Sequence, residues 1–174
     1  MSSLIRYPKV PLWRRGTALA VDCLPVGLIS ALAANNLVIW LLLFIPIWLG
    51  LRVAVVLNNQ GQSLGRWAFN MRIAELHKGK TPLLPVLLKR EALIGLECGL
   101  AVFGLMRLGP MAAWAVILLL PLLGDACVML ADPINKQTLH DRIAATAVIS
   151  SRRGYRLDLK IRKIVAIVRQ RMKK

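Results

Sequence analysis

Four long apolar stretches alternate with polar and basic segments along the chain. They cover residues 15–34, 37–57, 93–108 and 111–130. A helix crosses the hydrocarbon core of a bilayer with about 20 mostly apolar residues. Three stretches reach that length, and the third is short unless the amphipathic segment 83–88 leads into it. The pattern predicts four transmembrane helices joined by two short turns and one long loop, with a kink at Pro46 in the second helix.

Two polar segments outside these stretches have patterns of their own, the long loop and the C-terminal tail. In the loop between the second and third spans, residues 69–76 alternate like a strand, and a turn is expected near Gly79. After the fourth span, residues 152–174 hold ten Lys or Arg against the single acid Asp158, with apolar residues at helical spacing. That pattern indicates a basic amphipathic helix on an anionic membrane surface. An RNA-binding segment and a partly disordered tail are the alternatives. The basic residues expected at the lipid surface are Arg152, Arg153, Arg156, Lys160, Arg162, Lys163, Arg169 and Arg171.

The expected fold is therefore all-α: a polytopic helical bundle over residues 1–149, followed by a basic helix over 150–174. Composition agrees, since 57% of residues are hydrophobic and the mean hydropathy is +0.59. The net charge of +16 would suggest nucleic acid in a soluble protein. Here the positive residues gather in the long loop and at both ends, while the two short turns carry only Arg107. By the positive-inside rule, both termini lie in the cytoplasm. The expected location is the bacterial inner membrane, with multiple passes.

Three acidic residues lie inside apolar stretches: Asp22, Glu97 and Asp125. A carboxylate at the centre of a bilayer costs about 2.5–3.5 kcal/mol on insertion scales, so it needs a proton, a cation or an arginine. Arg15 precedes Asp22 by seven residues and falls on the same helix face, which makes it a possible partner. Two interpretations follow. The acids form steps for a proton or cation between helices, or they form ion pairs that hold the helices together.

Little in the sequence points to an enzyme or a cofactor. His77 and His140 are the two histidines, in separate loops and outside any zinc-protease, hydrolase or phosphate-binding motif. Three cysteines, Cys23, Cys98 and Cys127, lie in apolar stretches without paired spacing, so we expect small buried apolar residues and no metal site. Residues 31–33 have the small-x-small form of a signal-peptide cleavage site. The aspartate and proline of the preceding stretch argue against cleavage, and we expect the first helix to be retained.

Three segments in order resemble the RDD family of membrane proteins, named for one arginine and two aspartates. They are Arg15-x6-Asp22, the stretch 61–66 (Gly-Gln-Ser-Leu-Gly-Arg), and the stretch 138–146 with its Leu-His-Asp-Arg core. The resemblance implies that Arg15 is the family arginine, that Asp22 is the first aspartate and that Asp141 is the second. Lys89-Arg90-Glu91 also resembles a recurrent basic step of the family. The likeness spans about residues 10–149 and leaves out the basic tail, while Glu97 and Asp125 are additions to the family pattern.

The resemblance implies an architecture more firmly than an activity. Transport of ions or small solutes has been proposed for the family, and four helices would need a homo-oligomer or a partner to enclose a path. An accessory or assembly factor of a larger membrane complex is the second hypothesis. Binding of anionic lipid or RNA through the tail is the third. The segment 7–12 is similar to small cyanobacterial members, which would make a thylakoid membrane possible. We also expect Asp141, beyond the fourth span, to meet Arg15 at the cytoplasmic interface.

Overall fold

The computed structural model describes residues 10–33, 35–76, 79–110, 112–132 and 136–151. The predicted basic helix over 150–174 lies almost entirely outside the described residues. Four long helical rods dominate the fold, and their bounds follow the apolar stretches of the sequence. They are α1 (Leu12–Ser30), extended by the turn η1 (Ala31–Ala33); the rod α2 (Leu37–Leu49), η2 (Gly50–Ala54) and α3 (Val55–Asn58); α5 (Leu84–Arg107); and the rod η3 (Ala113–Leu119) and α6 (Leu120–Ala131).

Two of these rods are long and apolar enough to cross a membrane. They span residues 37–58 and 113–131, with hydropathies of 2.3 and 2.2. The other two, α1 and α5, are comparably long but carry charged residues. Helix α5 begins at Leu84, not at Leu93 as the apolar stretch suggested. A proline in its first turn suits a helix start, because no hydrogen-bond donor is needed there.

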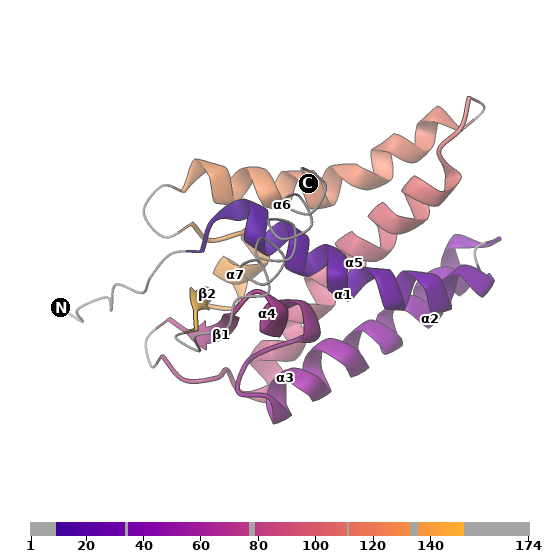
Figure 1. The fold of residues 1–174 in the computed structure, drawn as a ribbon. Helices are drawn as coiled ribbons and strands as arrows, with labels where there is room; N and C mark the ends of the chain where they lie inside the picture. The colour runs from indigo at the N-terminus through magenta and orange to yellow at the C-terminus, as the bar shows by residue number, and fades with distance from the viewer. Residues whose placement is uncertain (1–9, 34, 77–78, 111, 133–135, 152–174) are drawn as a thin grey trace, which may run out of the picture.

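The rods are arranged so that both short turns lie at one end of the bundle (Figure 1). The small elements gather at the opposite end: α4 (Leu64–Ala68), α7 (Leu139–Ile143), and the strands β1 (Met71–Glu75) and β2 (Thr146–Ser150). Rod α2 packs against α1 and α5, α5 packs against η3 and α6, and α4 packs against α1. The segments that carry these small elements are therefore folded onto this end of the bundle.

The fold is mostly helical, as predicted, and among the described residues one two-stranded sheet is the departure from an all-α fold. β1 pairs antiparallel with β2, from Met71 opposite Ser150 to Glu75 opposite Thr146. β1 falls inside the stretch that alternates in the sequence, whereas β2 was not foreseen. Both strands bury their first, third and fourth residues and leave the others partly exposed. A single two-stranded pair has little stability alone, so packing against the bundle end supports it.

An aromatic ladder fixes α5 against α2. Trp40, Phe44 and Trp48 are fully buried at successive helical turns, with neighbouring ring centroids 5.7 Å apart. The indole N–H of Trp40 donates to the carbonyl of Gly99, and that of Trp48 donates to the carbonyl of Glu91, both at 3.0 Å. These bonds set the register of the two helices and thereby fix the position of Glu91 in the bundle.

Candidate functional site

A continuous network of buried ion pairs joins the bundle to its folded end. Four arginines contribute, Arg15, Arg52, Arg66 and Arg90, and three carboxylates, Asp22, Glu91 and Asp141. Isolated buried charges are costly, and such groups persist when they are paired and hydrogen-bonded. The network contains all three residues that the RDD resemblance singles out.

Asp141 receives two arginines from different helices. Arg15 of α1 lies 3.3 Å from its Oδ2, and Arg90 of α5 lies 2.6 Å from its Oδ1. The hydroxyl of Thr138 accepts a hydrogen bond from the Asp141 backbone N–H and so caps α7. The structure thus brings together Arg15 and Asp141. Burial raises the pKa of the Asp141 carboxyl, but nearby positive charge, chiefly that of Arg90, outweighs burial and lowers the pKa to about 2.

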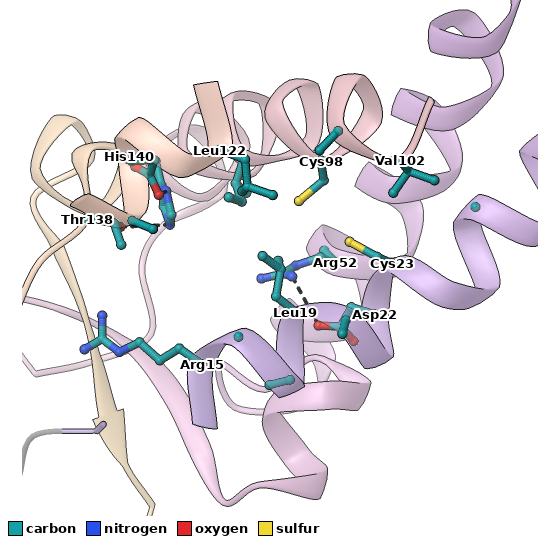
Figure 2. Close-up of a pocket in the computed structure, with 18 of the residues that line it drawn as sticks. Arg15, Leu19, Asp22, Cys23, Arg52, Cys98, Val102, Leu122, Thr138 and His140 are labelled. Atoms are coloured by element: carbon teal, nitrogen blue, oxygen red, sulfur yellow. Dashed lines mark hydrogen bonds and ion pairs between the residues drawn. The ribbon is translucent and has the colours of Figure 1, made fainter. Parts of the chain in front are cut away.

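Asp22 has partners other than the expected Arg15. Its carboxylate accepts hydrogen bonds from the Ser63 hydroxyl at 2.6 Å and the Gly65 backbone N–H at 2.7 Å. Arg52 completes the set with an ion pair of 3.2 Å, drawn in Figure 2. The side chain is fully buried. The stretch 61–66 therefore folds onto α1 as a cap for the carboxylate of Asp22.

Glu91 is the centre of the network. Its oxygens lie 2.8 Å from Arg52 Nε, 2.9 Å from Arg66 Nη2 and 2.5 Å from Arg90 Nη1. Arg52 sits in the π-helical turn η2, and its guanidinium lies over the Trp48 ring, 4.6 Å from the centroid. Such turns rearrange the side chains of a helix locally and often occur at functional sites.

Arg52, Arg66 and Glu91 were not predicted as site residues. The available signals were an arginine near the end of a strongly apolar stretch and the Lys89-Arg90-Glu91 step. Neither signal indicates which residues pair, because the partners lie far apart in the sequence and meet only when α1, the loop and α5 pack together.

Two predicted intramembrane acids form no ion pair with the arginines of this network. Glu97 of α5 and Asp125 of α6 come together with His140 of α7, and one potential ligand atom from each lies within 4.8 Å of the others. All three residues are buried, with 4–6% of their surface exposed. Among the described residues, no arginine or lysine forms an ion pair with Glu97 or Asp125. This Glu97–Asp125–His140 cluster is the second polar centre of the fold.

A cavity of about 770 Å³ runs beside both centres, between α1, α5 and α6. Its walls are largely apolar, from residues such as Leu24, Leu28 and Leu123, and its polar end includes Arg15, Asp125 and His140. In Figure 2, His140 and Thr138 lie across the cavity from Arg15. The cavity therefore joins a hydrophobic interior to charged groups from several elements.

The cysteines take no part in either centre. Cys98 is buried and Cys23 is half-buried, as small apolar residues, but Cys127 is exposed on α6, so the expectation that all three are buried was wrong for Cys127. Its position on a helix with a largely exposed apolar face explains the difference, since such a face does not need a protein partner in a lipid environment.

Two apolar rods long enough to cross a membrane, in a bundle with a buried ionic network at one end, indicate a helical membrane protein. The chain belongs to the RDD family, whose model matches residues 9–145. No curated protein sequence and no solved structure matches the chain.

Proposed function

We propose that this RDD protein is a four-span inner-membrane protein that transports a cation through the cavity between α1, α5 and α6. The observation that supports this is the division of the buried carboxylates. Asp22, Glu91 and Asp141 are neutralised by arginines, whereas Glu97 and Asp125 have no arginine partner in the described part of the chain. A carboxylate already paired with arginine has little attraction left for a cation. The two carboxylates without an arginine partner are therefore the residues that would bind the transported ion.

The proposed topology places the folded, basic end in the cytoplasm and the two short turns outside. Rods 37–58 and 113–131 cross the bilayer on their own apolarity. In our proposal α1 and α5 complete the set of four spans, because Asp22 of α1 and Arg90 and Glu91 of α5 are buried and paired within the bundle and do not face lipid. A second copy of the chain would close the open side of the cavity.

The test is cation flux into proteoliposomes that contain the purified full chain, followed with dyes for Na⁺, K⁺ and divalent ions. Flux above that of empty liposomes is expected, with a loss of at least 10-fold in Glu97→Gln. Glu75→Gln, which removes a carboxylate from β1, is the matched control and should retain flux. Absence of flux for every cation, with the protein shown to be folded, would exclude the transport proposal.

A non-catalytic accessory role is the second candidate, and one observation favours it. The network of arginines and carboxylates is almost entirely buried and ties five elements together, α1, η2, α4, α5 and α7, as expected for a rigid scaffold. The apolar walls of the cavity would then accept a helix of a partner protein. Crosslinking in native membranes, followed by purification, would distinguish the two roles. A defined partner crosslinked to α1 or α6 would support the accessory role, and a chain crosslinked only to itself would count against it.

A further inference from the structure

We propose that Glu97, Asp125 and His140 bind a divalent first-row transition-metal ion of the Zn²⁺ class. The inference deepens the proposed transport function, because it assigns a chemical class to the cation. It goes against the sequence-based expectation of no metal site. Three different helices supply the ligands, α5, α6 and α7, so the site exists only in the folded bundle.

The ligand set selects the class of metal. An imidazole nitrogen suits zinc, copper, iron and nickel, whereas magnesium and calcium prefer sites made of oxygen alone. Two carboxylates also supply two negative charges, which neutralise a divalent ion in a region from which water is largely excluded. Three protein ligands leave a further coordination position open, as in sites where the metal must exchange ligands.

Two buried side-chain atoms of the cluster, Oε2 of Glu97 and Nδ1 of His140, have no hydrogen bond in the described part of the chain. Nδ1 of His140 lies 2.9 Å from Oδ2 of Asp125 but is not aligned for a hydrogen bond with it. Ligand atoms around a tetrahedral zinc ion lie about 3.4 Å apart, given metal–ligand bonds of about 2.1 Å. The observed limit of 4.8 Å requires only small side-chain rotations to close around the ion.

The neighbouring groups orient the ligands as metal sites require. Oδ1 of Asp125 accepts a hydrogen bond of 3.1 Å from the His140 backbone N–H, which leaves Oδ2 directed to the site. Nε2 of His140 lies 3.1 Å from the Thr138 hydroxyl. With the metal on Nδ1, the proton resides on Nε2 and is donated to that hydroxyl, and the 3.3 Å contact of Nε2 with Arg90 Nη2, which can only donate, is lost. Metal-bound histidines almost always have such an outer partner for the second ring nitrogen.

The site also has a path for the ion. Asp125 and His140 line the cavity between α1, α5 and α6, and a carboxylate oxygen of Glu97 lies within 4.8 Å of their potential ligand atoms. Arg90 approaches His140 Nε2 to 3.3 Å, but its guanidinium is held by Asp141 and Glu91. The positive charge next to the site is therefore already balanced by carboxylates that take no part in metal binding.

The test is Co²⁺ and Zn²⁺ binding to the full chain, purified through a tag that lacks histidine and reconstituted in nanodiscs. We expect one Co²⁺ per chain, a visible absorption spectrum of nitrogen and oxygen ligands, and competition by Zn²⁺ but not by a 100-fold excess of Mg²⁺. His140→Ala and Glu97→Gln should each weaken binding at least 10-fold. His77→Ala and Cys127→Ser are matched controls for the other histidine and the exposed thiol, and both should bind like the wild type.

Three results would overturn the inference: no saturable Co²⁺ binding, a sulfur-ligand spectrum that disappears in Cys127→Ser, or equal binding in wild type and His140→Ala. If a variant fails to fold, the melting temperature of the wild type tests the metal site by itself. Zn²⁺ should raise that temperature and Mg²⁺ should not. Metal binding without flux of any cation would reject transport and leave the site standing. Flux of Na⁺ or K⁺ without metal binding would reject the site and leave transport standing.

Discussion

Replacement of Gly65 by alanine tests how α4 is held against α1. A Cβ atom at Gly65 would lie 2.0 Å from the carbonyl oxygen of Ala18 and 2.8 Å from its carbonyl carbon, where real Cβ atoms keep at least 3.0 Å. Backbone atoms cannot rotate away, so α4 must move from α1 by about 1 Å. The Gly65 N–H bond to Asp22, now 2.7 Å, would then exceed hydrogen-bonding distance.

The expected loss of stability has two parts. Overpacking costs about 1–3 kcal/mol, and loss of a hydrogen bond to a charged group costs about 1.5–3 kcal/mol. The sum is about 2.5–6 kcal/mol. In a chain of this size, 1 kcal/mol corresponds to about 2–4 °C in Tm, so the Tm should fall by at least about 5 °C.

The assay is thermal unfolding in detergent micelles, followed by tryptophan fluorescence. Gly16→Ala is a matched control, because Gly16 lies in α1, the helix against which Gly65 packs, and no atom lies within 4 Å of the position that its new Cβ would take. It should be neutral or slightly stabilising, since alanine favours a helix by up to about 1 kcal/mol over glycine. A Gly65→Ala variant that melts within 2 °C of the wild type would refute the close packing of α4 on α1.

Three further predictions concern the ion-pair network and the basic tail. Arg52→Gln leaves Asp22 and Glu91 each short of one partner and should cost about 3–5 kcal/mol in unfolding free energy, measured by denaturant titration in micelles. The pKa of Asp141 is lowered by folding, so its contribution is fully present above its unfolded value and is lost as pH falls toward 2. The Tm should accordingly fall between about pH 4 and pH 2, less steeply in Asp141→Asn. Removal of residues 152–174 should abolish binding of neutral-lipid nanodiscs to anionic vesicles, and unchanged binding would reject the lipid-surface role of the tail.

The positions of the helices could be predicted from hydropathy because long apolar runs have few alternatives to a helix in a bilayer. The contact between Arg15 and Asp141 was expected from their position near the same interface. The partners of Asp22 could not be predicted, since Ser63, Gly65 and Arg52 reach it only when the loop folds back onto α1. Strand β2 was missed for a similar reason. Its partner β1 is separated from it in the sequence by α5, η3, α6 and α7.

The Glu97–Asp125–His140 cluster shows the same limit at the candidate site. The two acids were identified as unusual because of their apolar surroundings, but His140 was noted only as a loop histidine outside any catalytic or metal-binding motif. Nothing in the spacing of the three residues relates α5, α6 and α7. Only the packing of these helices places one ligand atom from each within 4.8 Å of the others.

The most direct test of the central claim compares Asp22→Asn with Glu97→Gln in two measurements, Tm and cation flux per folded molecule. Asp22 has an arginine partner and Glu97 has none among the described residues, so we expect opposite results for the two variants. Asp22→Asn should lower the Tm, because Arg52 loses a partner, and should retain at least half of the flux. Glu97→Gln should lose at least 10-fold in flux and keep the Tm of the wild type. Loss of flux in Asp22→Asn at unchanged Tm, with normal flux in Glu97→Gln, would contradict the claim.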